Sequence, residues 1–324
     1  MSFLKNSSHQ LLLGVVVSML IAFLFPWNAS YGIDLKNLVS WGIVGIFFFY
    51  GLKVDLKESV KDVSNWKLHL FIQLFTFLIF PLIILVFYPF FTENEYFPLW
   101  LSVFFLAALP STVSSAVIMT SVAKGNIPAA ILNATITGLI GLLVTPLWVG
   151  IFLKKSSLDL DFISIFWDLT KQILIPVIAG LLLNKLLKKY TLKSKPFLSW
   201  YDKIIIFIII YKSFSAAITD DIFASFSWGI IATLFIVLTL LFVVVYLLVL
   251  KSTTLLNFSL KDRKTAIFSA TQKSLVHGSV FVIILIPDVK KQTLILLAVM
   301  IYHTLQIIFT SFIASRFQKK LEIE

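Results

Sequence analysis

Apolar residues along this chain come in long blocks that short polar stretches separate. A block of about 20 apolar residues is long enough for an α-helix to cross the hydrocarbon of a bilayer. The pattern predicts an all-α polytopic membrane protein, a single membrane unit over residues 1–324. The ten predicted transmembrane helices are residues 10–27, 37–54, 66–90, 97–123, 127–153, 166–188, 203–222, 226–250, 264–286 and 291–316.

The composition agrees with this class. Hydrophobic residues make up 59% of the 324 residues and charged residues only 13%, whereas soluble domains are near 25% charged. The net charge of +11 lies in short loops and not on a soluble face, so it indicates membrane orientation and no nucleic-acid partner. We expect a lipid bilayer and a small-molecule solute as partners, and the sequence leaves monomer and homodimer open. The chain has no cysteine, which excludes disulfides and thiolate metal sites.

Basic residues alternate between the two sides of the ten-helix arrangement and set its orientation. The side richer in lysine and arginine faces the cytoplasm, so we expect both termini there. The basic residues on that side are Lys53, Lys57, Lys61, Lys67, Lys185, Lys188, Lys189, Lys193, Lys195, Lys203, Lys251, Lys261, Arg263, Lys264, Arg316, Lys319 and Lys320. The opposite side carries Glu93, Glu95, Asp220, Asp221, Lys36, Lys154, Lys155, Lys290 and Lys291.

Ten helices divide into two halves of five, residues 10–153 and 166–316. Because five crossings bring the chain to the opposite side of the membrane, the two halves form an inverted repeat, which is a common plan among transporters. The fourth helix contains PSTVSSAVIMT, residues 110–120, and the ninth contains SATQKS, residues 269–274. Both stretches are polar and small where a membrane helix is otherwise apolar.

Interrupted helices at matching places in two halves point to a binding site near the middle of the membrane. Non-helical backbone is tolerated at that depth only where protein or a water-filled cavity covers it. Freed carbonyls suit a cation, and freed N–H groups suit an anion. The alternative for the first stretch is a proline kink that Ser and Thr hydroxyls absorb by bonding back to their own helix.

Four stretches of the chain resemble a known family. They are GLKVDLKESVKDVSNWKLHLFIQLFTFLIFPL, LPSTVSSAVIMTSVAKGNIPAAILNATITGLIG, SATQKSLVHGS and IYHTLQIIF. Together they resemble the bile acid:sodium symporter superfamily, and in particular its SBF-like branch, which includes bacterial proteins and the seventh member of human solute carrier family 10. The resemblance to bacterial members implies a bacterial inner (plasma) membrane. The resemblance implies two domains, with the broken fourth and ninth helices crossing in the core. The core would be residues 66–153 and 226–316, and the panel residues 10–54 and 166–222.

The resemblance also implies sodium sites beside the crossing, near Gln73, Ser115 and Gln272. The pattern departs from the family at three positions: Ala116 replaces an asparagine, Phe268 a glutamate and Lys273 an asparagine. Two unit charges about 5 Å apart repel by roughly 3 kcal/mol at an effective dielectric of 20, so sodium beside a charged lysine binds poorly. We therefore expect no pair of sodium sites, with sodium or a proton left as candidates for the coupling ion and no other cofactor. Two alternatives remain open, a neutral Lys273 and an ammonium that points away from the site, and a neutral lysine would make transport depend on pH.

Lys273 is the most unusual residue, because a lysine in the middle of a membrane is costly and faces a cavity or a helix bundle. It can occupy a cation site with its own ammonium, carry a proton, or bind an anionic substrate. The structural alternative is a lysine bonded to the carbonyls of the fourth-helix interruption. We expect it to gather with polar residues of neighbouring helices around the crossing. The candidate substrate- and ion-binding set is Gln73, Ser111, Thr112, Ser114, Ser115, Asn133, Thr137, Ser269, Thr271, Gln272, Lys273, Ser274 and His303.

The motifs of common enzyme classes are absent. The chain has no HExxH, GxSxG or Walker A sequence and no histidine cluster at metal spacing, so we expect neither an enzyme nor catalytic residues. The sequence favours a secondary active transporter of a small, anionic organic solute. The alternative is a non-transporting membrane regulator of ion (calcium) homeostasis built on a transporter scaffold. Neither the substrate nor the direction of transport follows from the sequence.

Overall fold

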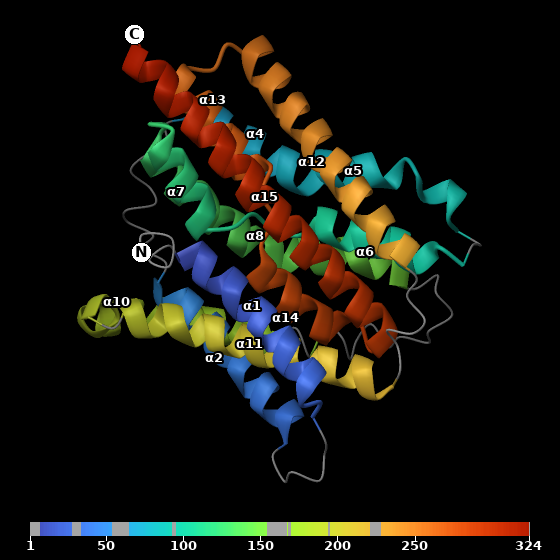
Figure 1. The fold of residues 1–324 in the computed structure, drawn as a ribbon. Helices are drawn as coiled ribbons and strands as arrows, with labels where there is room; N and C mark the ends of the chain where they lie inside the picture. The colour runs from blue at the N-terminus through green and yellow to red at the C-terminus, as the bar shows by residue number, and fades with distance from the viewer. Residues whose placement is uncertain are drawn as a thin grey trace. The chain divides into compact units, whose positions relative to one another are not determined.

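The computed structural model describes residues 7–27, 34–53, 65–92, 95–153, 167, 170–193, 195–220 and 228–323, and every element within them is a helix (Figure 1). Helices suit a bilayer because each backbone group finds its partner within the same segment. The all-α class is therefore confirmed for these residues. Six residues used to predict the orientation, Lys57, Lys61, Glu93, Lys154, Lys155 and Asp221, lie outside them.

The helices follow the predicted apolar blocks closely. The first half contains α1 (Ser7–Leu24), α2 (Leu35–Lys53), α4 (Trp66–Leu74), η4 (Phe75–Ile79), α5 (Phe80–Leu85), η5 (Tyr88–Phe90), α6 (Phe97–Ala108), α7 (Ser114–Val122) and α8 (Ile127–Leu153). The second half contains η6 (Thr170–Leu174), α10 (Ile175–Lys193), α11 (Lys195–Thr219), α12 (Trp228–Leu255), α13 (Leu260–Ala270), α14 (Leu275–Leu285) and α15 (Val289–Ile323).

Six helical stretches in the described part of the chain are long and apolar enough to cross a membrane. They are Leu35–Lys53, Trp66–Phe90, Ile127–Phe152, Trp228–Leu255, Leu260–Leu285 and Val289–Gln318. Three shorter apolar helices lie at Leu13–Leu24, Phe97–Ala108 and Thr170–Asn184. The count of ten transmembrane helices stays a prediction.

Both expected interruptions are present. Helix α6 ends at Ala108 and α7 begins at Ser114, with Leu109 in an extended conformation at φ −70° and ψ 151°. Pro110 explains this end, because a proline disfavours the helical conformation of the residue before it and has no N–H to continue the ladder. The second interruption separates the end of α13 at Ala270 from the start of α14 at Leu275.

The third predicted helix contains a feature that its apolar pattern did not predict. Residues 75–79 form a π-helical turn, η4, in which the N–H of Phe80 bonds to the carbonyl of Phe75, five residues back. Pro81 follows directly and has no N–H to donate. The turn therefore leaves the carbonyl of Thr76 without a partner in its own helix.

The chain divides into two compact units. The first comprises Met1–Asp55, Gly150–Phe226 and Ser279–Leu296. In it α1 packs on α11 and α2 on α10. A Cβ at Gly51 of α2 would lie 2.3 Å from the carbonyl oxygen of Val177, and one at Gly180 of α10 would lie 2.2 Å from that of Phe48. The two glycines thus let the helix backbones touch, as small residues commonly do in membranes.

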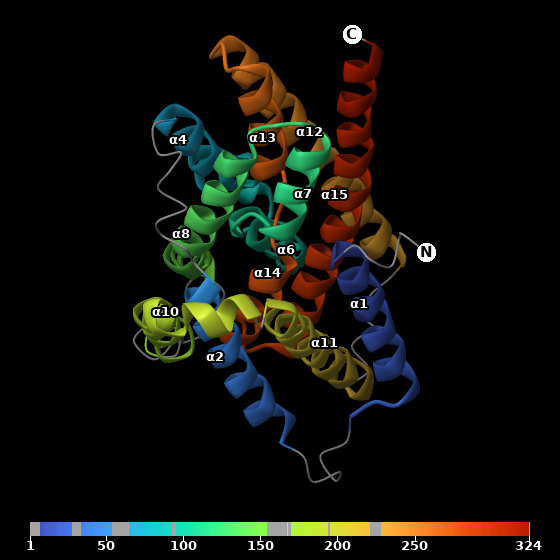
Figure 2. The same cartoon turned by 90° about the vertical axis from the view of Figure 1, so that its left-hand side faces the viewer.

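The second unit comprises Leu56–Val149, Ser227–Gly278 and Leu297–Glu324. Here α13 packs against α7 and α4 (Figure 2). Helix α6 packs against α5 and α12. Phe80, Phe104, Phe268 and Tyr302 are fully buried in its core. All the candidate site residues predicted from the sequence belong to this unit.

Candidate functional site

The carbonyls of the first interruption are hydrogen-bonded by the second interruption and by α8. The four consecutive carbonyls of residues 107–110 each accept a hydrogen bond. Their donors are, in order, Lys273 Nζ (2.6 Å), Thr145 Oγ1 (2.7 Å), Lys273 Nζ (2.8 Å) and the N–H of Ser274 (2.9 Å). Buried carbonyls that lose their helical partners must find others, and here the second interruption supplies three of the four bonds.

The second interruption is held by α15. Tyr302 donates its hydroxyl to the carbonyl of Thr271 at 2.7 Å. Gln306 accepts from the N–H of Lys273 at 2.7 Å and donates to the carbonyl of the same residue at 2.9 Å. Its side-chain amide therefore replaces the two backbone bonds that a continuous helix would have made at Lys273.

The side chain of Lys273 is enclosed, with 1% of its surface exposed. Its Nζ lies 2.9 Å from the carbonyl oxygen of Thr76, 2.6 Å from that of Ala107 and 2.8 Å from that of Leu109. We call these three oxygens the carbonyl cage. The ring of Phe80 covers the ammonium from another side, with its centroid 4.2 Å from Nζ. Because an ammonium has three N–H donors, the cage uses all of them and leaves none for a solute.

A second cluster joins α7 to the interruption before α14. Thr112 and Ser115 both donate their hydroxyls to Gln272 Oε1, and the Thr112 bond is 2.6 Å long. The two hydroxyl oxygens also lie 2.6 Å apart. The Gln272 side chain is fully buried, and its Nε2 finds no hydrogen-bond acceptor among the described residues. We call these three side chains the hydroxyl–amide cluster.

Gln73 belongs to a different cluster, between α4 and α8. Its Nε2 lies 2.9 Å from Thr137 Oγ1 and 3.3 Å from Asn133 Oδ1. Asn133 in turn lies 2.8 Å from Nδ1 of His69. The structure thus brings together Gln73, Asn133 and Thr137, whereas Gln272 hydrogen-bonds to α7. His69 was not predicted, although it lies four residues before Gln73, a spacing that places both on one helix face.

His303 carries a buried donor. The N–H of Lys273 fixes the orientation of the Gln306 amide, so Gln306 Nε2 donates to His303 Nδ1, 2.9 Å away. His303 Nδ1 must then be an acceptor, which assigns the proton of the neutral ring to Nε2. That nitrogen has no partner within the described part of the chain, and the side chain is 5% exposed.

The remaining candidates differ in their surroundings. Ser111 and Ser269 are buried, and their hydroxyls have no partner among the residues that the structure describes. Ser114 is exposed at the start of α7. Thr271 bonds back to its own helix at Ile267. Ser274 caps α14, because its Oγ accepts from the N–H three residues later at 3.3 Å.

The described residues contain no group of three or more His, Asp or Glu side chains that could hold a metal ion. The oxygens of the hydroxyl–amide cluster are all neutral. Phe268, where the resemblance implies a glutamate, is fully buried in the apolar core. The ionisable group that the second interruption brings to this site is therefore the amine of Lys273 and not a carboxylate.

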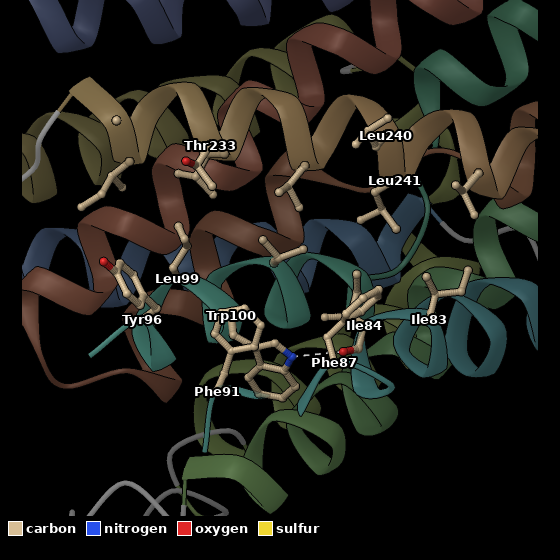
Figure 3. A pocket seen from close by; sticks show the side chains of 16 residues that line it. Ile83, Ile84, Phe87, Phe91, Tyr96, Leu99, Trp100, Thr233, Leu240 and Leu241 are labelled. Carbon is tan, nitrogen blue, oxygen red and sulfur yellow. Dashed lines mark hydrogen bonds between the residues drawn. The ribbon is translucent and has the colours of Figure 1, made fainter. Parts of the chain in front are cut away.

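The second unit also has an apolar groove of about 900 Å³ between α12 and the helices α5 and α6 (Figure 3). Its walls are mainly aliphatic and aromatic. The indole N–H of Trp100 points to the carbonyl of Ile84 at 3.0 Å, so it is already used (Figure 3). Binding sites for polar solutes need a few convergent polar groups, and the interruptions supply them where this groove does not.

The part of the chain that the structure describes is helical, with six stretches apolar enough to cross a membrane, and its two helix interruptions are joined through their backbones. Interrupted helices that meet in this way are a feature of many membrane transporters. The chain belongs to the SBF-like CPA transporter family, whose model matches residues 9–319. This match confirms the resemblance to the SBF-like branch and the expectation of an integral membrane protein.

Three relatives extend over nearly the whole chain. Putative symporter YfeH of Escherichia coli is 26% identical over 310 residues, 96% of this chain and 93% of its own length. Sodium/bile acid cotransporter 7 of Rattus norvegicus is 30% identical over 307 residues, 93% of this chain and 89% of its own length. An uncharacterized protein of Pseudomonas aeruginosa is 28% identical over 312 residues, 95% of this chain and 92% of its own length. The two names that state an activity support a transport function.

Proposed function

We propose that the protein is a secondary active transporter that moves a small organic anion by alternating access. It would have ten transmembrane helices in two inverted repeats, residues 10–153 and 166–316, with both termini in the cytoplasm of a bacterial cell. The core would be residues 66–153 and 226–316, and the panel residues 10–54 and 166–222. The names of the relatives, putative symporter and sodium/bile acid cotransporter, support the class of activity.

The observation that carries this proposal is the bond between the two interruptions, from the N–H of Ser274 to the carbonyl of Pro110. Broken helices that meet are costly in a membrane, because every freed backbone group needs a new partner. Transporters use such meeting points to hold solutes and ions. A binding role would explain why the chain keeps both interruptions.

Two buried donors favour an anionic solute. Gln272 Nε2 and the Nε2–H of His303 have no acceptor among the described residues, and the ammonium of Lys273 adds a positive charge to the same unit. Native proteins seldom leave buried donors unpaired. A carboxylate or another anionic group bound near the interruptions would accept from them.

The same residues argue against coupling to a pair of sodium ions. The hydroxyl–amide cluster offers only neutral oxygens, and the neighbouring residue in the chain is the charged Lys273. A cation in a low-dielectric site needs a carboxylate or many carbonyl dipoles to offset its charge. We infer that the coupling species is a proton or a single sodium ion.

The test is uptake by the purified protein in proteoliposomes under separate sodium and proton gradients. Labelled taurocholate, succinate and benzoate would represent bile acids, dicarboxylates and aromatic acids. The proposal is supported if one of the gradients drives uptake into proteoliposomes and protein-free liposomes show no such uptake. If folded protein moves none of the three under either gradient, the regulator of ion homeostasis becomes the better hypothesis.

A further inference from the structure

The carbonyl cage holds the ammonium of Lys273 as a protein holds a bound metal cation. We propose that this ammonium is a built-in substitute for a monovalent cation, and that removing the side chain converts the carbonyl cage into a binding site for a small cation such as ammonium. The inference rests on the proposed function only in its last step, the consequence for coupling.

The walls of the cage are backbone oxygens freed by two different irregularities. The π turn and Pro81 leave the carbonyl of Thr76 without a helical partner. The end of α6 and Pro110 free the carbonyls of Ala107 and Leu109. Carbonyl oxygens that converge on one point replace the hydration shell of a cation, as they do in the filters of potassium channels.

The number of acceptors around Nζ matches a protonated amine. Three carbonyl oxygens lie within 2.9 Å of Nζ, and each of them can only accept a hydrogen bond. A neutral amine has two N–H donors and would present its lone pair to the third oxygen. An ammonium has three donors and satisfies all three.

The ring of Phe80 is the second independent feature of a cation site. Its centroid lies 4.2 Å from Nζ, and the face of an aromatic ring attracts a cation at such distances. The side chain of Phe80 is itself fully buried. The ammonium is therefore surrounded by dipoles and a ring face, without a carboxylate among its described contacts.

A tethered cation has a consequence for coupling. An ion bound from solution leaves when its site opens, and that release links transport to the ion gradient. The charge of Lys273 stays with the chain, so the cage keeps its positive charge at any sodium concentration. We therefore expect that the cage of the wild-type protein does not depend on an external cation.

The experiment compares the thermal unfolding midpoints of the full-length wild type and of Lys273→Ala in detergent. Each is titrated with ammonium, methylammonium, potassium and sodium chlorides, with choline chloride as the control for ionic strength. We expect a midpoint several degrees lower for Lys273→Ala. Ammonium or methylammonium should raise it in a saturable manner, whereas choline should not. The wild type should respond equally to all of these salts.

Lys264→Ala is the matched control. Lys264 is also a buried lysine of the second unit, 3% exposed, and its Nζ lies over the ring of Phe317 at 5.4 Å and not among the cage oxygens. Its replacement should cause no specific response to ammonium. An equal response of both variants would overturn the proposal, and so would no response of Lys273→Ala. Failure to recover folded Lys273→Ala with ammonium present throughout purification also counts against it.

The stability readout separates this proposal from the proposed function. Specific stabilisation of Lys273→Ala by ammonium, together with no uptake by the wild type, would retain the cage as a cation site and reject the transporter. Uptake by the wild type, without any ammonium effect on Lys273→Ala, would retain the transporter and reject the cage as a cation site.

Discussion

The N–H of Ser274 and the carbonyl oxygen of Pro110 lie 2.9 Å apart, so the backbone of one interrupted helix completes the backbone of the other. Neither interruption can become a regular helix without leaving a buried polar group of its partner unpaired. The two irregular stretches are therefore stable only together.

Gln306 should contribute strongly to stability. Gln306→Leu would leave the N–H and the carbonyl of Lys273 unpaired in the core. Each orphaned buried group costs about 1–3 kcal/mol, so we expect a loss of about 2–6 kcal/mol, measured by denaturant unfolding in detergent. Thr304→Ala is the control, because the Thr304 hydroxyl bonds back only to Met300 of its own helix. Equal losses in the two variants would contradict the role of Gln306.

The hydroxyl–amide cluster should affect solute handling if the proposed function holds. Thr112→Val removes one of the two hydroxyl donors to Gln272 Oε1 while keeping the shape of the side chain. A loss of about 1–3 kcal/mol predicts an increase in KM for uptake of about 5- to 150-fold. Thr135→Val is the control, since Thr135 bonds back to Ile131 on an exposed face. Unchanged uptake by the Thr112 variant would exclude the cluster from the site.

The effects of replacing Pro81 and Lys273 on stability should not be additive, because Pro81 leaves free the carbonyl that Lys273 binds. Pro81→Ala supplies an N–H near the carbonyl of Thr76, which then competes with Lys273 Nζ. In a double-mutant cycle with Lys273→Met, we expect a coupling free energy of about 0.5–3 kcal/mol, measured by thermal unfolding. Pro98→Ala should show no coupling, because Pro98 lies in the first turn of α6, where its missing N–H is harmless.

The contact between α2 and α10 should tolerate no side chain at its glycines. In Gly51→Ala or Gly180→Ala the new methyl would meet a rigid backbone oxygen within 2.3 Å. Overpacking of this kind costs about 1–3 kcal/mol, which unfolding of the purified variants can measure. Gly229→Ala, at an exposed position in the first turn of α12, should be neutral or stabilising. A neutral result at both Gly51 and Gly180 would show that the helices can separate without cost.

Local signals made the helices and their interruptions predictable. The apolar blocks determine the helices, and Pro110 ends one of them by lacking an N–H whatever its surroundings. The polar and small residues at 269–274 are also a local signal, because they stand out within an apolar stretch. The link of Gln73 to Asn133 and Thr137 follows from the need of a buried amide for partners, which neighbouring helices supply.

Other features depend on contacts that no sequence pattern contains. The π turn at 75–79 is completed by a donor 197 residues away in the chain, the Nζ of Lys273. The partners of that lysine are main-chain oxygens, which every residue type has, so no motif identifies them. Gln73 and Gln272 were expected near the same crossing, and the sequence did not show their hydrogen-bond partners, which lie on α8 for Gln73 and are Thr112 and Ser115 for Gln272. Gln73 lies on α4 and Gln272 lies within the second interruption, and the packing of the helices decides which neighbours each side chain meets.

The cage oxygens belong to the main chain, which has an evolutionary consequence. Replacing the amino acid at position 76, 107 or 109 alters a side chain but leaves a carbonyl oxygen in the main chain. The walls of the cage therefore tolerate most substitutions at these positions. The residue at position 273 is different, because its side chain alone decides whether the cage is filled from within. A lineage that keeps the two prolines can thus gain or lose dependence on an environmental cation by a single replacement, without rebuilding the protein.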